Sequence, residues 1–293
     1  MTFSLIQTFR PSFLVLTPIC LFLAAALANF KGFHVSLIPL LIMLVTALLA
    51  HIAVNTLNEY YDFKSGLDLT TDKTPFSGGS GTLPARPDLA SATLAIGVSS
   101  VVIIAILGLY LAFATTLAII PFGLIGLLIV ISYTQWLNKV PLLCLVAPGI
   151  GFSTIMIIGS YLTLTRELSI DIWLIGLIPF LQINNLLLLN QYPDVEADNA
   201  NGRNTLPIRY GPNFSNVIYL LFAIIPFILL SLLISMQILP LLSYLAMVGL
   251  PFAVFACIGA LKEKFGIGQQ PKYLAANVAC SLLTPLFLAI SLL

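Results

Sequence analysis

Two clusters of carboxylate and amide side chains occur in a chain that otherwise avoids charge. They read Asn58-Glu-Tyr-Tyr-Asp62-Phe-Lys-Ser-Gly-Leu-Asp68 and Asn190-Gln-Tyr-Pro-Asp194-Val-Glu-Ala-Asp198. Only 11 of the 293 residues are Asp or Glu, and eight lie in the two segments that bear these clusters: Glu59, Asp62, Asp68, Asp72, Asp88, Asp194, Glu196 and Asp198. Crowded carboxylates repel one another and resist ionisation unless a cation compensates them. The clusters therefore predict bound divalent metal, and a polyanion for that metal to hold.

The segments between the clusters are long and apolar. The chain is 59% hydrophobic and 8% charged, with a mean hydropathy of +1.07. Apolar runs of about 20 residues are typical of transmembrane helices. Nine such runs cover residues 11–29, 35–57, 89–112, 116–133, 141–162, 172–189, 216–234, 239–261 and 273–293. We therefore expect an all-α polytopic membrane protein that forms a single domain over residues 1–293. The four cysteines lie in apolar runs without a C-x-x-C pattern, which indicates neither a disulfide framework nor a zinc site.

The basic residues predict how the chain lies in the membrane. With nine spans, ten of the 12 Lys and Arg residues fall in the N-terminal tail and in the loops after even-numbered spans, and only Lys31 and Arg166 fall on the other side. Basic loops stay cytoplasmic. We therefore expect a cytoplasmic N-terminus in the cell inner (plasma) membrane, with both acidic clusters on the cytoplasmic side. The net charge of +1 identifies no partner, and no nucleic acid is expected.

Polar residues of the second span fall on one helical face. His51, Asn55, Asn58 and Asp62 are spaced four, three and four apart. At about 100° per residue, the steps from His51 to Asp62 end only about 20° from the start. Polar groups within a membrane turn toward a cavity or a partner helix. This stripe is therefore predicted to face the protein interior. His51 is left open as a contact to a substrate or as a bond to a neighbouring helix.

The sixth span ends in a similar pattern. Asn190, Asp194 and Asp198 are spaced four apart, and Pro193 predicts that the helix kinks or restarts there. Three amides lie deeper in this span, and each is left open as part of the site or as a hydrogen-bonding link between helices: Gln182, Asn184 and Asn185.

Together these motifs resemble those of the UbiA superfamily of intramembrane prenyltransferases, over essentially the whole chain. The five-residue gap between Asp62 and Asp68 is similar to the naphthoate (menaquinone) branch, whereas the 4-hydroxybenzoate branch typically has three residues there. The second cluster continues into Gly202-Arg203-Asn204-Thr205-Leu206, similar to the family's Gly-Lys-Arg-Thr-Leu. Asn204 departs from a common basic residue, and Pro193 departs from a common arginine. The resemblance implies a helical bundle around a central cavity that opens to the cytoplasm.

The resemblance also implies a reaction and its site residues. The expected activity is transfer of a polyprenyl group from an isoprenyl diphosphate to an aromatic acceptor, with 1,4-dihydroxy-2-naphthoate in menaquinone biosynthesis as the leading acceptor. Two Mg²⁺ ions would bridge the motifs and the diphosphate. The expected ligands are Asp62 and Asp68 for one ion and Asp194 and Asp198 for the other, supported by Asn58. The residues expected at the diphosphate are Lys64, Lys139, Arg203 and Tyr133, and those expected in the acceptor pocket are His51, Asn55 and Asn190.

Two further features could serve this chemistry. Departure of diphosphate leaves an allylic cation, which aromatic faces stabilise. Tyr60, Tyr61 and Tyr192 are candidates for this role, although anchoring at the membrane interface is the commoner role of such tyrosines. The segment Ser77-Gly-Gly-Ser-Gly-Thr82 could present backbone N–H groups to phosphate, or it could be a plain mobile loop.

Three alternatives stay open. The acceptor could be 4-hydroxybenzoate, homogentisate or another aromatic compound. A cation-coupled secondary transporter would also need membrane carboxylates, but near the midplane of the bilayer, whereas these lie at helix ends. A CDP-alcohol phosphotransferase would need a compact Asp-x₂-Asp-Gly-x₂-Ala-Arg motif, which the sequence lacks.

Overall fold

The computed structural model describes residues 2–71 and 73–293, and within these residues it is helical without a strand. Asp72 of the first acidic segment lies outside the described residues. The α-helices are α1 Thr2–Gln7, α2 Pro11–Leu14, α3 Leu16–Phe30, α4 Leu37–Ser65, α5 Leu67–Thr70, α6 Thr82–Ala85, α7 Ala90–Ala114, α8 Ile120–Ser132, α9 Pro141–Gly149, α10 Ser160–Thr165, α11 Ile170–Asn190, α12 Val195–Ala200, α13 Leu206–Ser235, α14 Leu250–Glu263 and α15 Pro271–Ile290. Short 3-10 helices are η1 Pro87–Leu89, η2 Leu117–Ile119, η3 Leu137–Lys139, η5 Leu241–Gly249 and η6 Lys264–Gln269, and η4 Ile150–Gly159 is a π-helix.

The long helices correspond to the apolar runs of the sequence. In the described part of the chain, eight helical segments are long and apolar enough to cross a membrane, and a shorter apolar segment covers Leu117–Ser132. Each overlaps one of the nine predicted spans. The prediction of an all-α polytopic protein is therefore confirmed.

The second span is longer than its apolar run. The run ends at residue 57, but α4 continues to Ser65 and ends at Gly66, whose φ of 85° is the left-handed conformation that terminates many helices. Polar residues such as Glu59 and Lys64 propagate a helix almost as well as leucine does, so loss of hydropathy does not mark its end. As a result, Asn58 and Asp62 lie on the same helix as His51.

The helix of the sixth span ends and a new helix begins around Pro193, as the sequence predicted. α11 ends at Asn190, and α12 begins at Val195 after a turn that contains Pro193. The next long helix, α13, begins at Leu206, ten residues before its predicted start, and bends at Gly211, whose φ of 74° is not helical. Both acidic segments thus end in short helices joined to long ones.

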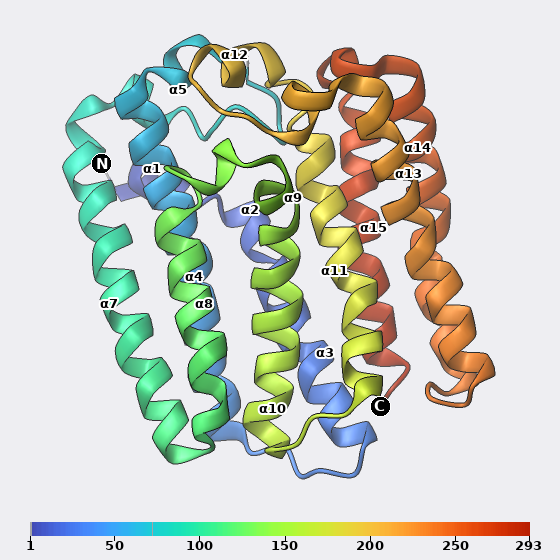
Figure 1. The fold of residues 1–293 in the computed structure, drawn as a ribbon. Helices are drawn as coiled ribbons and strands as arrows, with labels where there is room; N and C mark the ends of the chain where they lie inside the picture. The colour runs from blue at the N-terminus through green and yellow to red at the C-terminus, as the bar shows by residue number, and fades with distance from the viewer. Residues whose placement is uncertain (1, 72) are drawn as a thin grey trace.

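The short helices that carry these segments gather at one end of the bundle. Figure 1 shows α5 and α12 above the long helices, while the C-terminus lies at the opposite end. We call the end with α5 and α12 the site end and the opposite end the far end. Below the site end, the largest cluster of buried apolar side chains joins α3, η4, α11, α13 and α15. This core fixes the long helices that position the two acidic segments.

A cavity of about 590 Å³ lies within the bundle. Its walls come from α3, α4, α7, α8, α11 and the continuous helix formed by α9, η4 and α10. Asp194, Asp198 and Arg203 line its polar part at the site end, and Met43 and Thr163 line its apolar part toward the far end. The π-helical turn η4 contributes Gly151, and a helix of this kind inside an α-helix is common at functional sites.

Candidate active site

The polar stripe of α4 faces the cavity, as its spacing predicted. His51, Asn55 and Asn58 all line the cavity. The Nδ1 atom of His51 lies 2.9 Å from the hydroxyl oxygen of Thr17, and the ring packs edge-on against Phe152. Asn55 Nδ2 donates to a backbone carbonyl near the N-terminus at 2.8 Å. These bonds hold the stripe against α3 and the segment before α2, so that its remaining polar atoms face the cavity.

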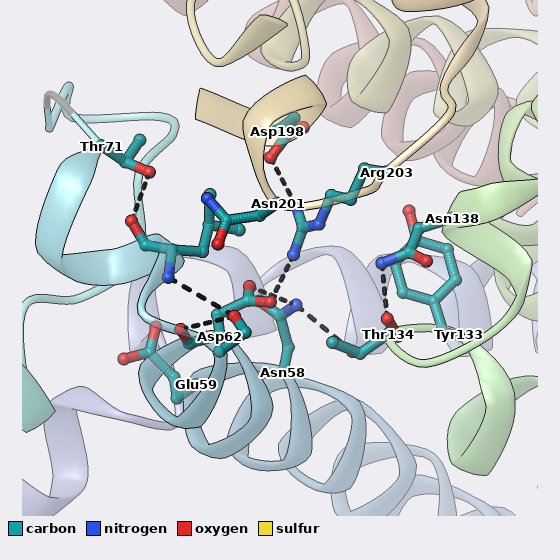
Figure 2. A network of polar contacts seen from close by, with 12 residues as sticks. Asn58, Glu59, Asp62, Thr71, Tyr133, Thr134, Asn138, Asp198, Asn201 and Arg203 are labelled. Atoms are coloured by element: carbon teal, nitrogen blue, oxygen red, sulfur yellow. Dashed lines mark hydrogen bonds and ion pairs between the residues drawn. The ribbon is translucent and has the colours of Figure 1, made fainter. Parts of the chain in front are cut away.

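Arg203 joins the two acidic motifs. Its Nη2 atom donates to Asp62 Oδ1 at 2.5 Å, and its Nη1 atom donates to Asp198 Oδ1 at 3.0 Å. Figure 2 shows the guanidinium between the two carboxylates, with Asn58 beside Asp62. The Asp62 and Asp198 side chains are 9% and 4% exposed. Burial alone would lower the pKa of Arg203, but the two carboxylates outweigh burial and raise it.

The loop between α8 and α9 forms a third side of this site. Asn58 Nδ2 donates to Asp62 Oδ2 at 2.8 Å and to the Thr134 hydroxyl at 3.3 Å. Asn138 Nδ2 donates to the Thr134 carbonyl, and the Asn138 carbonyl accepts from the backbone N–H of Asn204 at 2.9 Å. Asn204 stands where the motif that this sequence resembles commonly has a basic residue. Its backbone N–H therefore joins this loop to the turn that carries Arg203.

A glycine-rich strap, residues 77–82, crosses the site end. Glu59 is fully buried on α4 and anchors the strap, because it accepts from the Ser80 backbone N–H at 2.8 Å and from the Ser80 hydroxyl at 2.5 Å. Arg10 neutralises Glu59 at 2.6 Å and also donates to Asn58 Oδ1 at 2.9 Å. Gly78, Gly79 and Gly81 have positive φ values, so the strap is an ordered turn rather than an unconstrained loop.

The strap lies against the remaining two aspartates. A Cβ atom on Gly79 would lie 2.9 Å from Asp68 Oδ1. Burial raises the pKa of Asp68 to about 7, and the nearby Glu59 and Asp62 add to this effect. Burial likewise raises the pKa of Asp194 to about 7, helped by Asp198, while the Ser77 hydroxyl and the Gly78 backbone oppose the shift. Burial raises the pKa of Asp198 itself to about 6.

These carboxylates fit a hard divalent cation that a ligand completes. Asp68 Oδ2 and Asp194 Oδ1 are buried and find no hydrogen-bond partner in the part of the chain that the structure describes, which a buried oxygen tolerates poorly. Among the described residues, no three His, Cys, Asp or Glu side chains converge closely enough to hold an ion alone. Mg²⁺ is often bound by one or two carboxylates together with phosphate oxygens and water. The donor set therefore fits Mg²⁺ bound together with a phosphorylated ligand better than a cage made of protein alone.

The other predicted site residues divide into two groups. Tyr133 and Asn190 line the cavity, and Asn190 Oδ1 is buried without a partner. Lys64 and Lys139 are exposed and do not line it. The Lys64 ammonium lies 5.8 Å from the centre of the Tyr60 ring, and the Lys139 carbonyl accepts from Asn204. A contact of Lys64 or Lys139 with diphosphate stays a prediction.

The deeper amides of α11 join helices. Asn184 Oδ1 accepts from the Gly149 N–H at 2.6 Å, Asn185 Nδ2 donates to the Tyr219 carbonyl at 2.7 Å, and Gln182 contacts Cys280. These contacts reach α9, α13 and α15 respectively. Of the two interpretations left open for these amides, the structure supports links between helices.

The three tyrosine candidates do not line the cavity, whereas other aromatic rings do. Tyr192 is fully buried in a separate core cluster, where its hydroxyl donates to Asn216. None of the described cavity-lining residues is Tyr60, Tyr61 or Tyr192. Five other aromatic side chains do line the cavity: Phe13, Phe76, Phe122, Tyr133 and Phe152. Hydropathy cannot separate a cavity-facing ring from a lipid-facing one, because both lie in apolar helices.

Sequence reasoning also missed Arg10 as a site residue. It was counted only as a basic residue of the N-terminal tail, yet it lines the cavity and bonds Glu59 and Asn58. One signal was present in the sequence, since Glu59 lies on a helix that enters a membrane and a buried carboxylate there needs a cation. Nothing in the sequence identified which of 12 basic residues supplies it.

Comparison with known proteins is consistent with this arrangement. A sequence model of the UbiA prenyltransferase family matches residues 15–266. The chain belongs to the UbiA prenyltransferase family. A relative from Bacillus subtilis (strain 168), a 1,4-dihydroxy-2-naphthoate octaprenyltransferase, is 31% identical over 212 residues, which are 70% of this chain and 65% of the relative. The matched region thus spans just under two thirds of that protein.

Solved UbiA homologues have the same fold as this family member. The homologue from Archaeoglobus fulgidus bound to DMAPP and Mg²⁺ superposes with a TM-score of 0.65 at 14% identity, covering 94% of this chain and 98% of the other. A digeranylgeranylglyceryl phosphate synthase superposes with a TM-score of 0.63 at 15% identity, covering 98% of each chain. At these identities the likeness concerns the fold.

Proposed function

We propose that this UbiA family protein transfers a polyprenyl group from an isoprenyl diphosphate to an aromatic acceptor at the site between α4 and α12. The observation that carries the proposal is the Asp62–Arg203–Asp198 bridge, which brings both acidic motifs to the polar part of an apolar cavity. A diphosphate on an isoprenoid tail has this same division into a charged head and an apolar tail. The DMAPP and Mg²⁺ bound to the Archaeoglobus homologue support the proposal.

In this proposal, the aspartates of the two motifs would hold two Mg²⁺ ions, with Asn58 in support. Bound there, Mg²⁺ would neutralise the diphosphate and make it a better leaving group. Asp68 and Asp194 each offer a buried oxygen without a hydrogen-bond partner for this purpose. Arg203 and Tyr133 line the cavity beside the motifs and can contact phosphate oxygens.

The cavity residues orient the substrates and exclude water. When the allylic C–O bond breaks, its electron pair leaves with the diphosphate and an allylic cation remains. Phe13, Tyr133 and Phe152 line the cavity and can stabilise that cation with their ring faces. The polar atoms of His51, Asn55 and Asn190 are assigned to the aromatic acceptor. The apolar walls keep bulk water from the cation, which would otherwise be hydrolysed.

We take 1,4-dihydroxy-2-naphthoate as the acceptor, because the Bacillus relative acts on that compound. The test supplies purified protein with geranylgeranyl diphosphate, Mg²⁺ and one of three acceptors: 1,4-dihydroxy-2-naphthoate, 4-hydroxybenzoate or homogentisate. Product masses are then measured. We expect prenylated product with the naphthoate. Product with another acceptor alone would replace the naphthoate assignment, and absence of product with all three would contradict prenyl transfer to these aromatic compounds.

We further propose that the site end faces the cytoplasm from the inner membrane. Ten of the 12 basic residues lie in the tail and loops assigned to that side. Single cysteines placed at Arg86, near the site end, and at Lys31, on the opposite side, can be labelled in intact cells with a membrane-impermeant maleimide. Labelling is expected at position 31 and not at position 86, and the reverse pattern would invert the proposed orientation.

A further inference from the structure

The Arg203 guanidinium lies between two carboxylates that the proposed function assigns to Mg²⁺. It contacts Asp62 at 2.5 Å and Asp198 at 3.0 Å, and these two carboxylates come from motifs on α4 and α12. Both bonds are made to Oδ1 atoms of carboxylates that are less than 10% exposed. The guanidinium therefore joins the two motifs across the site and partly neutralises them.

A carboxylate oxygen that accepts a hydrogen bond from Arg203 is not available in the same geometry to a metal ion. Divalent metal beside Asp62 and Asp198 would also repel the guanidinium at close range. Asp68 and Asp194 lie close enough to Arg203 for its charge to act on them. Metal held by these two carboxylates would therefore be repelled by the guanidinium as well. Metal on Asp62 Oδ1 and Asp198 Oδ1 is therefore incompatible with Arg203 in its observed position.

The backbone of Arg203 is fixed on both sides, so any change is confined to its side chain. The Arg203 N–H donates to the Asp198 carbonyl at 3.0 Å, and the Asn204 N–H donates to the Asn138 carbonyl at 2.9 Å. The side chain is 18% exposed and lines the cavity that would hold the diphosphate. A rotation of the side chain away from the carboxylates would keep its charge within this polar region.

We propose that Arg203 is a resident cation that holds the two motifs together in the metal-free protein. Divalent metal displaces it from Asp62 and Asp198, and the released guanidinium then binds diphosphate oxygens. This inference rests on the proposed function, since it takes the two motifs as the metal site. Guanidinium suits both positions, because its planar fork matches carboxylate and phosphate alike.

The proposal predicts effects of opposite sign on two ligands. Without Arg203 the carboxylates have no internal competitor, so Arg203→Gln should bind the first divalent ion more tightly. The same variant should bind diphosphate more weakly once metal is present. A role in maintaining the site architecture would weaken both. Opposite signs therefore distinguish a displaced cation from a structural residue.

The experiment measures Mn²⁺ binding by electron paramagnetic resonance on full-length protein in lipid nanodiscs, without any diphosphate. We compare wild type, Arg203→Gln and the matched control Arg209→Gln, which removes an exposed positive charge six residues away. Arg203→Gln is expected to bind the first Mn²⁺ about tenfold more tightly, and Arg209→Gln is expected to match wild type. Inorganic pyrophosphate, titrated at saturating Mn²⁺, is expected to bind Arg203→Gln at least several-fold more weakly.

Each outcome has a defined meaning. Equal or weaker Mn²⁺ binding by Arg203→Gln, with normal binding by wild type, overturns the displacement alone. Absence of Mn²⁺ binding by wild type even in the presence of inorganic pyrophosphate overturns the proposed metal site and this inference with it. If Arg203→Gln does not fold, Arg203→Lys serves instead. It keeps the charge but cannot form the two-pronged bridge, so tighter Mn²⁺ binding is again expected, and unchanged binding overturns the displacement.

Discussion

At the scale of single residues, the site combines neutralised and uncompensated carboxylates. Arg10 neutralises Glu59, and Arg203 is shared between Asp62 and Asp198. Within residues 2–71 and 73–293, Asp68 and Asp194 form no such ion pair, and each has a buried oxygen without a hydrogen bond. The first acidic segment thus contains both an internal ion pair with a structural role and an oxygen suited to an added cation.

This difference between neutralised and uncompensated carboxylates predicts that the effect of Mg²⁺ on thermal stability depends on pH. Burial raises the pKa of Asp68 and Asp194 to about 7. A carboxyl whose folded pKa exceeds its unfolded value binds more protons when folded, so the metal-free protein loses stability as pH rises toward that pKa. Mg²⁺ binds the ionised form. The Mg²⁺-induced rise in Tm should therefore be small near about pH 5.5 and grow by several degrees by about pH 8.

Variants test the origin of that pH dependence. The double variant Asp68→Asn with Asp194→Asn removes the two groups with a pKa of about 7, and it should show little Mg²⁺-induced change in Tm at either pH. Asp171→Asn changes an aspartate paired with Lys31 outside the two motifs and should behave like wild type. A Mg²⁺ effect on the wild-type Tm that is equal at both pH values would contradict this account.

At the scale of elements, the strap depends on glycine at a position where it touches an aspartate. Gly79 has a φ of 73°, and a Cβ there would lie 2.9 Å from Asp68 Oδ1. Gly32 has a φ of 84°, and a Cβ there would meet nothing within 4 Å. Both positions impose the left-handed conformation, which costs about 1–2 kcal/mol for other residues. Only Gly79 adds a contact with a proposed metal ligand.

Gly79→Ala and Gly32→Ala therefore form a matched pair. Both should lower stability by about 1–2 kcal/mol, as measured by thermal unfolding in detergent. Only Gly79→Ala should also weaken Mg²⁺-dependent diphosphate release, by about tenfold or more, because it moves Asp68 or the strap. Equal activity of the two variants would show that the strap does not position the Asp68 carboxylate.

The elements also show what sequence could and could not provide. Hydropathy located the spans, and the spacing of His51, Asn55, Asn58 and Asp62 gave the cavity-facing side of α4. The bonds from Arg10 to Glu59 and from Arg203 to Asp62 join residues 49 and 141 apart. Such pairs have no periodic signal within one element, and their geometry follows only from how the long helices pack.

The strap illustrates the same limit. Its glycines allowed either a phosphate-binding turn or a mobile loop, because composition gives conformational freedom without giving contacts. The hydrogen bonds that Ser80 donates to Glu59 fix the strap to α4 and make it an ordered turn. Nothing in the sequence indicated that Glu59 anchors the strap, because there it was one of several acidic residues in a cluster.

At the scale of the whole molecule, the cavity continues far below the acidic motifs. Along α4 it is lined from Asn58 to Met43, a helical rise of roughly 22 Å. Glycines line its deeper walls, and a Cβ at Gly108 of α7 or Gly123 of α8 would meet nothing within 4 Å. The space beside these glycines is therefore available to the isoprenoid tail under the proposed function.

Side chains that fill this space should lower activity with long isoprenoid donors more than with short ones. Gly108→Leu and Gly123→Leu are expected to reduce kcat/KM for geranylgeranyl diphosphate and longer donors by about tenfold or more, while geranyl diphosphate is affected little. Ile106→Phe adds volume at a side chain that is 61% exposed and does not line the cavity, so it serves as the control. An equal loss for short and long donors would show that the tail does not occupy this region.

The central claim is that the two acidic motifs form one metal-dependent site. The most direct test measures diphosphate release from geranylgeranyl diphosphate, with acceptor present, by wild type, Asp62→Asn, Asp194→Asn and the control Asp171→Asn. The account predicts release by wild type and the control that stops with a chelator and returns with Mg²⁺, and loss of at least about a thousandfold in each motif variant. Near-normal release by either motif variant in correctly inserted protein would contradict it.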